Sequence, residues 1–124
     1  MVLLVADRGG SSQLDDWLAP LAEGYADVLH IQGIADLSAV PRLLRPGVRA
    51  LFRKNEAVPI WMDWTGEVAE RFGAQAEVAN VYLIAPSGEV LHRVSGAFTT
   101  SDWQTLRDAI DASTRHPAQS APDR

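Results

Sequence analysis

Apolar residues along the chain alternate between two patterns, short continuous runs and sets at helical spacing. A continuous run of this kind predicts a buried strand at residues 2–6, and further strands are predicted at residues 27–32, DVLHIQ, and at the apolar residues 58–62. Helical spacing follows each run, over residues 12–24, 36–55 and 67–72. Strands and helices that alternate in this order predict parallel strands joined by helical crossovers.

The first helix carries recognisable start and stop signals. Ser12 with Asp15 three residues later matches the capping-box pattern and predicts the start. Pro20 lies late in the apolar pattern and predicts a kink or a stop. Gly24 then closes the element.

Residues 36–55 show a second helical pattern that is interrupted twice. Pro41 and the Pro46-Gly47 pair fall within it, so we expect two consecutive helices or one broken helix. The third pattern, over residues 67–72, is short, and Gly73 is its natural C-terminal stop.

The clearest local signal is a β-hairpin. Residues 80–85 and 89–95 are rich in Val, Leu, Ile and Tyr, and a turn separates them. Within that turn, Pro86 presets φ for the first central position of a type I turn, and Gly88 suits its last position. The two runs are therefore predicted to pair as antiparallel strands.

A last helix is predicted to begin at Thr100 or Ser101, either of which can cap it. The element order β-α-β-α-β-α-β-β-α then predicts one α/β domain over residues 1–113. We expect a mixed sheet covered by helices on both faces, with a C-terminal antiparallel hairpin and a final helix. Residues 114–124 lack apolar periodicity and predict a disordered tail.

Cysteine is absent from the 124 residues, and this absence excludes more chemistry than any other count. Without a thiol there is no disulfide, no thiolate nucleophile, no dithiol redox cycle and no thiolate metal site. The net charge of −5 argues against nonspecific nucleic-acid binding, which depends on Lys and Arg neutralising phosphates. No apolar run approaches the roughly 20 residues of a membrane span, and residues 1–6 are too short for a signal peptide. We therefore expect a cytoplasmic protein with no cofactor, nucleic-acid partner or membrane partner.

Two nearby segments carry a family resemblance, VPIWMDWTGEVAERFGA at residues 58–74 and NVYLIAPSGEVLHRVSG at residues 80–96. They resemble the thioredoxin-like superfamily, in particular its peroxiredoxin and TlpA-like branch. In that branch a strand ends in Asp, a short helix ends in an aromatic residue and Gly, and a Gly-containing turn leads to a strand ending in Gly. These features fall here on Asp63, Phe72-Gly73, Pro86-Ser87-Gly88 and Gly96. The resemblance, which extends in element order over residues 2–112, implies a thioredoxin-like three-layer sandwich.

The same resemblance locates a degenerate active-site loop. It places Gly9 and Ser12 in the two cysteine positions, and Ala79-Asn80 where the family usually has a cis-proline. A serine hydroxyl cannot cycle through a disulfide, so the redox activity of the family does not carry over. The candidate site residues that remain here are Gly9, Gly10, Ser11, Ser12 and Asn80.

The loop from Gly9 to Ser12 supports two interpretations. Free N–H groups at the start of a helix favour a bound phosphate or carboxylate, and an enzyme could use such a site. The alternative is a simple turn followed by a helix cap, and Asp7, Asp15 and Asp16 would oppose an anion there. Ser11 or Ser12 as a nucleophile would need an aligned base, and no His lies nearby in sequence.

A second candidate is a basic stripe of arginines at spacings of three, four and four, namely Arg42, Arg45, Arg49 and Arg53. Guanidinium groups match carboxylates and phosphates, so the stripe predicts an acidic partner, a second subunit or an anionic ligand. The alternative is a solvated helix face, which Pro46 would interrupt. Trp64 follows the third strand as a candidate anchor for a partner, although such residues also line cores and pockets.

Metal binding is not predicted. His30, His92 and His116 lie in two different strands and in the tail, without the spacing of a metal motif. Asp63 is expected to cap the end of its strand or to form the turn there, with acid-base work as the alternative.

Two classes of function follow from these residues. The first is a redox-inactive thioredoxin-like domain that acts as a protein-interaction or accessory module. The second is a cysteine-independent enzyme or small-anion-binding protein that uses the Gly9 to Ser12 loop. An enzyme should have a pocket uniting that loop with Asp63 and Asn80, whereas a binding module should expose aromatic and arginine side chains on a flat or grooved patch. Homodimerisation through the basic stripe is a further possibility.

Overall fold

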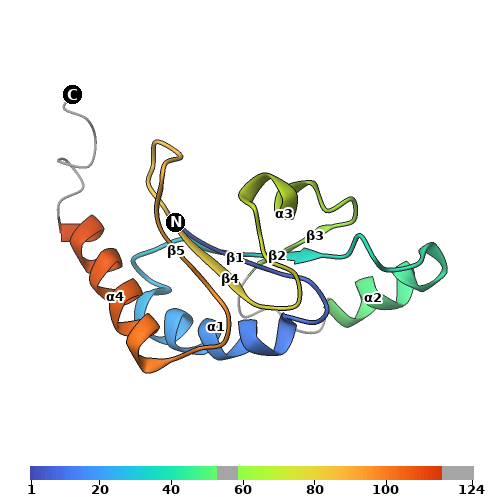
Figure 1. Cartoon of the computed structure of the whole chain (residues 1–124), viewed down its shortest axis with the longest axis horizontal. Helices are drawn as coiled ribbons and strands as arrows, with labels where there is room; N and C mark the ends of the chain where they lie inside the picture. The colour runs from blue at the N-terminus through green and yellow to red at the C-terminus, as the bar shows by residue number, and fades with distance from the viewer. Residues whose placement is uncertain (53–58, 116–124) are drawn as a thin grey trace.

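A mixed five-stranded sheet with the strand order β3-β2-β1-β4-β5 forms the centre of the computed structural model, which describes residues 1–52 and 59–115 (Figure 1). The strands are β1 Val2–Ala6, β2 Ile31–Asp36, β3 Ile60–Asp63, β4 Asn80–Ile84 and β5 Val90–Ser95. The first three are parallel, and β4 and β5 are antiparallel to their neighbours. The predicted α/β fold with a C-terminal hairpin is thus confirmed.

Helices cover both faces of this sheet. They are α1 Ser11–Tyr25, α2 Arg45–Phe52 after the 3-10 turn η1 Arg42–Leu44, α3 Glu67–Phe72 and α4 Thr100–Arg115. The helix α3 lies on one face, and α1 and α4 lie on the other (Figure 1). Within the described residues, no helix combines the length and the hydrophobicity that crossing a bilayer requires.

The position of β1 at the centre of the sheet explains why its sequence is apolar without alternation. Val2 and Leu4 pack into a core shared with α1 and α4, whereas Leu3 and Val5 pack into a second core beneath α3. All five residues of β1 are buried. A strand covered on both faces needs apolar residues at every position.

The second strand was predicted over residues 27–32, and this prediction is wrong. The end of α1 continues into a turn, in which the N–H groups of Val28 and Leu29 both donate to the Tyr25 carbonyl. The strand begins only at Ile31 and continues through Gly33, which we had taken as its boundary. Gly33 lies inside the strand, where the Ile60 side chain comes within 3.1 Å of the position that a Cβ would occupy. A glycine at this position leaves room for Ile60.

The helix α1 also differs from its prediction. It runs past Pro20 and Gly24 to Tyr25 without a stop. The Asp16 carbonyl that Pro20 leaves without a donor belongs to an exposed residue, so water can replace the missing bond. The predicted capping box is wrong as well, because Gly10 is the N-cap and no side chain caps the helix.

The predicted hairpin turn and the predicted end of α3 are confirmed, whereas the predicted cap of α4 at Thr100 or Ser101 is wrong. The Gly88 N–H donates to the Ala85 carbonyl (2.8 Å) and closes the hairpin turn, with Gly88 at φ +94°. Gly73 ends α3 at φ +67°. The helix α4 is capped one residue before the predicted positions, by Thr99, whose Oγ1 accepts the Asp102 N–H (3.0 Å). This helix runs to Arg115, and the rest of the predicted tail lies outside the described residues.

Candidate functional site

The degenerate active-site loop is tied to the segment before β4 by the carboxylate of Asp7. Its Oδ1 accepts the N–H of Gly10 (3.0 Å). The N–H of Glu77 donates to both oxygens, at 3.1 Å and 2.9 Å. One side chain therefore closes the loop on itself and also holds a segment 70 residues away, a role that sequence reasoning missed because it depends on a distant backbone donor.

The glycines of this loop allow a close approach of two backbones. A Cβ at Gly10 would stand 2.3 Å from the Val78 carbonyl oxygen, and one at Gly9 would stand 3.1 Å from the Glu77 Cα. On the other side, Gln13 of α1 accepts the Ala79 N–H at its Oε1 (3.0 Å). The loop and the segment 77–79 are thus packed together, and backbone N–H groups from both are already used.

The two serines of the loop face solvent. Ser11 donates its hydroxyl to the Arg8 carbonyl (3.1 Å), and Ser12 is exposed. His30 is exposed beside β2 and His92 lies on β5, while His116 is outside the described residues. Within residues 1–52 and 59–115, no three His, Asp or Glu residues form a group that could hold a metal ion.

Asn80, which stands where the resembled family usually has a cis-proline region, is a fully buried anchor. Its Oδ1 accepts the Gln75 N–H (2.9 Å) and the Ser95 hydroxyl (2.7 Å). Its Nδ2 donates to three carbonyls, those of Val5 (3.2 Å), Gln75 (3.0 Å) and Val78 (3.2 Å). Because its amide is fully engaged with β1, β5 and the preceding loop, Asn80 has no polar atom left for a ligand.

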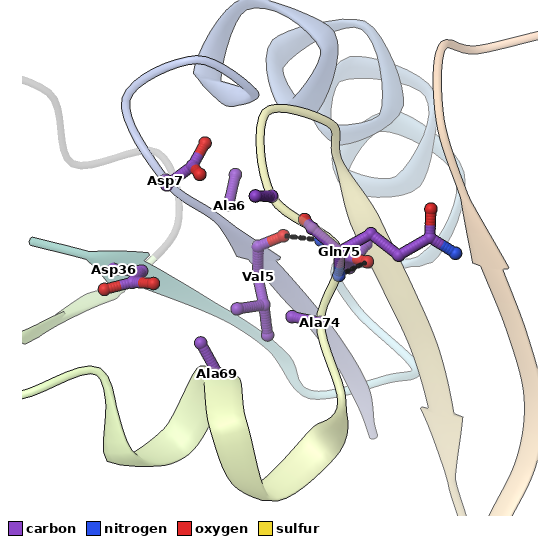
Figure 2. A pocket seen from close by; sticks show the side chains of 9 residues that line it. Val5, Ala6, Asp7, Asp36, Ala69, Ala74 and Gln75 are labelled. Atoms are coloured by element: carbon purple, nitrogen blue, oxygen red, sulfur yellow. Dashed lines mark hydrogen bonds between the residues drawn. The ribbon is translucent and has the colours of Figure 1, made fainter. Parts of the chain in front are cut away.

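A small cavity of about 60 Å³ lies beside this anchor. Figure 2 shows Asp7 and Asp36 on one side of it and Gln75 on the other. Neither the Gly9 to Ser12 loop nor Asp63 lines it. It has room for a few water molecules and is far smaller than the 300 Å³ or more of a typical ligand pocket. The cavity therefore does not bring together the Gly9 to Ser12 loop, Asp63 and Asn80, as the enzyme interpretation requires.

Each of the three parallel strands leads into an aspartate that caps the following turn. Asp7 follows β1, and Asp36 ends β2 and accepts the N–H and the hydroxyl of Ser38. Asp63 ends β3, is buried, and accepts three backbone N–H groups at the start of α3. The prediction of Asp63 as a strand-end cap is confirmed, and all three carboxylates are engaged by the protein itself.

Two of the four arginines of the basic stripe lie against one tryptophan. The Cζ atoms of Arg45 and Arg49 lie 5.0 Å and 4.8 Å from the centroid of the Trp64 ring. The two arginines are one turn apart on α2, and Pro46 does not interrupt them because it falls in the first turn, where a missing N–H is harmless. We call Arg45, Arg49 and Trp64 the arginine–tryptophan cluster.

The remaining arginines of the stripe have different positions. Arg42 is exposed in η1, ahead of the helix, and Arg53 lies outside the described residues. Among the hydrogen bonds within the described part of the chain, the guanidinium groups of the cluster take part in one, from Arg45 Nε to the Val40 carbonyl (3.4 Å). The cluster therefore keeps most of its N–H donors free of described protein acceptors.

A second stacked arginine shows what an internally engaged guanidinium group looks like here. Arg93 lies over the Tyr82 ring at 5.4 Å, and its Nη2 donates to the carbonyls of Phe72 and Gly73 at the end of α3. The Tyr82 hydroxyl also donates to Phe72. Burial raises the pKa of Tyr82, and Arg93 partly opposes that shift. Arg93 thus supplies donors to the carbonyl groups at the end of α3, whereas Arg45 and Arg49 donate to no described helix end.

A second tryptophan lies close to Trp64 in the sequence and is more exposed. Trp61, three residues earlier on β3, is 65% exposed, more than any other large hydrophobic side chain of the described strands. Trp64 itself is half-buried beneath the two arginines. Sequence reasoning chose Trp64 as the exposed anchor, but the structure exposes Trp61 more fully.

The solved structures that resemble this one include the following two. The first is a thiol:disulfide interchange protein DsbE from Chlorobium tepidum, with a TM-score of 0.63 and 18% identity over 90% of this chain and 77% of that one. The second is the exposed lipoprotein thioredoxin Etrx1 from Streptococcus pneumoniae strain TIGR4, with a TM-score of 0.64 and 15% identity over 86% of this chain and 82% of that one. No protein-family model matches the sequence, and a search of curated proteins found no significant match.

These neighbours establish the class of fold. The chain has a thioredoxin-like α/β fold, as the resemblance implied, and it has this fold without a single cysteine. At 15% and 18% identity the likeness concerns the fold alone. Thiol-disulfide exchange is excluded because the chain has no thiol.

Proposed function

We propose that this redox-inactive thioredoxin-like domain is a protein-interaction module that binds its partner through the arginine–tryptophan cluster. The observation that carries this proposal is that two guanidinium groups stack on one tryptophan ring at the surface. Both keep N–H donors that no described group of the protein accepts.

Stacking prepares these arginines for binding. A guanidinium group held against an aromatic ring has lost much of its side-chain freedom, so less entropy remains to be lost when it binds a carboxylate. Arginine and tryptophan are also the residues that most often dominate the energy of protein interfaces. In a chain of net charge −5, this local positive charge favours an acidic partner.

The Gly9 to Ser12 loop, which Asp7 closes on itself, supports the same proposal because it disfavours the alternative of a small-anion site. A small anion at the Gly9 to Ser12 loop would need free backbone N–H groups. The N–H of Gly10 already donates to Asp7, and the carboxylate of Asp7 would repel an anion beside it, although no side chain caps the first N–H groups of α1. Homodimerisation through the cluster would be a special case of the proposal, with a second copy as the partner.

The test compares two double variants that change the net charge equally. Arg45→Glu with Arg49→Glu reverses the cluster, and Arg8→Glu with Arg71→Glu reverses two exposed arginines elsewhere. In an affinity capture from the lysate of the native organism, we expect a partner that binds the wild type and the control but not the cluster variant. A partner retained by both variants would refute the proposal. Light scattering of each variant measures whether a second copy is that partner.

A further inference from the structure

The strand β3 forms one edge of the sheet, and its outer backbone groups have no strand partner among the described residues. On its inner side, the Pro59 carbonyl accepts the Gly33 N–H (2.8 Å) and the Asp63 carbonyl accepts the Leu37 N–H (2.9 Å). Alternate residues of a strand direct their backbone groups to opposite sides. The N–H and C=O groups of Ile60 and Met62 therefore point away from β2.

The side chains of β3 are unusually apolar for a free edge. Trp61 pairs with Ile34, which belongs to the core beneath α3, so Trp61 lies on the α3 face of the sheet. It is nevertheless 65% exposed, and Ile60 on the opposite face is 37% exposed. Proteins usually protect an edge with charged residues or proline. Here the strand has no Lys or Arg, and Pro59 precedes the outward-facing groups.

The arginine–tryptophan cluster lies at the carboxyl end of this edge. Trp64 directly follows Asp63, the last residue of β3, and holds Arg45 and Arg49 against its ring. A chain that paired with Ile60 and Met62 would end its pairing beside these two positive charges. The outward backbone groups and exposed apolar side chains of β3 are thus followed directly by Trp64 and the two positive charges stacked on its ring.

We propose that the partner binds as an extended acidic segment that adds a strand to the outer edge of β3. This proposal rests on the function proposed above and names the form of its partner. Main-chain hydrogen bonds to Ile60 and Met62 supply affinity, as in other cases of strand addition. Apolar side chains of the segment cover Trp61 and Ile60, and its carboxylates meet the guanidinium groups of the cluster.

A second copy of this chain fits that edge less well. Its own β3 would bring a single acidic residue, Asp63, whose oxygens already accept backbone N–H groups from Gly66, Val68 and Ala69. The arginines of both copies would then stay without carboxylates. Charge complementarity therefore favours a different protein.

A random library of 12-residue peptides displayed on phage provides the test. Selection on the full chain should enrich peptides in which apolar or β-branched residues alternate with others and Asp or Glu are frequent. The strongest peptide is then synthesised with N-methyl groups on alternate amides, in both registers. We expect one register to lower the affinity at least tenfold and the other to change it little, because only alternate N–H groups of an added strand face β3.

Variants of the protein separate this proposal from the one it rests on. Ile60→Pro removes an outward N–H without removing a bond to β2, and Ile60→Val is its matched control. We expect at least a tenfold loss of affinity for Ile60→Pro and for the double variant Arg45→Glu and Arg49→Glu, and less than twofold for Ile60→Val. Circular dichroism checks that each variant is folded, and the N-methylated peptides test the same bonds on the unaltered protein.

Each contrary result overturns a defined part. Peptides that need the arginines but tolerate both N-methyl registers would refute strand addition and leave the cluster as the binding site. Peptides that survive reversal of Arg45 and Arg49 would refute the function proposed for the cluster. Enrichment of basic or helical peptides, or no enrichment at all, would overturn the extended acidic partner.

Discussion

Two regions at the carboxyl ends of the parallel strands use their polar groups in opposite ways. Around Asn80, which accepts two hydrogen bonds and donates three, the loop after β1 and the segment before β4 are joined by bonds within the protein. Around Trp64, two arginines stack on a ring, and most of their N–H donors have no acceptor among residues 1–52 and 59–115. A polar group engaged by its own backbone contributes to stability, and one left free is available for a partner. The first region should therefore respond to mutation in stability, and the second in binding.

The largest loss of stability is expected from Asn80→Ala. It removes the contacts of the amide with five hydrogen-bonding partners and leaves the buried Val5 carbonyl without this donor, so we expect unfolding to become easier by about 4 kcal/mol. Urea denaturation followed by circular dichroism measures the change. Ser95→Ala, which removes only the bond to Asn80 Oδ1, is the control and should cost about 1 kcal/mol. Equal losses in the two variants would mean that Asn80 is no anchor.

The next largest effect is expected from a methyl group at Gly10. Its Cβ would meet the Val78 carbonyl oxygen at 2.3 Å, so two backbones must separate, and Gly10→Ala should cost about 2–3 kcal/mol. Gly24→Ala is the matched control because nothing lies within 4 Å of its Cβ position in α1. There, alanine should stabilise the helix by about 0.5–1 kcal/mol. Changes of the same sign in both variants would contradict the close packing of the loop.

Removal of the arginines should separate binding from stability. Arg45→Ala with Arg49→Ala removes two exposed cation–π contacts, each contributing about 0.5–1 kcal/mol. We therefore expect at most about 2 kcal/mol of lost stability, together with loss of the partner. A variant that keeps its partner, or that unfolds, would remove the contrast with the Asn80 region.

The smallest effect is a pH dependence that lies outside both regions. Burial, followed by a hydrogen bond to Asp111 (2.9 Å), raises the pKa of Tyr25 to about 12. The folded state therefore holds the proton more tightly than the unfolded one. The resulting stability is present below pH 10 and is lost as the pH rises from 10 towards 12. Tyr25→Phe should reduce this dependence in denaturation measured across that range, and Tyr82, whose pKa burial also raises, accounts for a part that remains. An unchanged slope would show that Tyr25 does not cause it.

Local signals predicted those parts of the fold that local chemistry decides. The hairpin was predicted from Pro86 and Gly88, and the end of α3 from Gly73, because each of these residue types favours the backbone conformation that its own turn requires. The second strand was misplaced because its position depends on a distant contact. Gly33 looks like a boundary in the sequence, but it accommodates Ile60 of a neighbouring strand.

The same distinction applies to the two candidate sites. The spacing of Arg45 and Arg49 predicted a shared helix face, and the structure adds their contact with Trp64. The roles of Asp7 and Gln13 could not be predicted, since their acceptor oxygens meet N–H groups 70 and 66 residues away, respectively. A weak signal did exist, because an aspartate stands at or just after the end of each parallel strand. That regularity indicates turn-capping carboxylates in a fold of this kind.

The central claim is that binding takes place at the arginine–tryptophan cluster and not at the closed loop. The most direct test is the affinity of the selected acidic peptide, measured by calorimetry, for the two charge-matched double variants. We predict at least a tenfold loss for Arg45→Glu with Arg49→Glu, and less than a twofold change for Arg8→Glu with Arg71→Glu, whose first residue directly precedes the Gly9 to Ser12 loop. A loss confined to the Arg8 and Arg71 variant would contradict the claim and direct attention back to the loop.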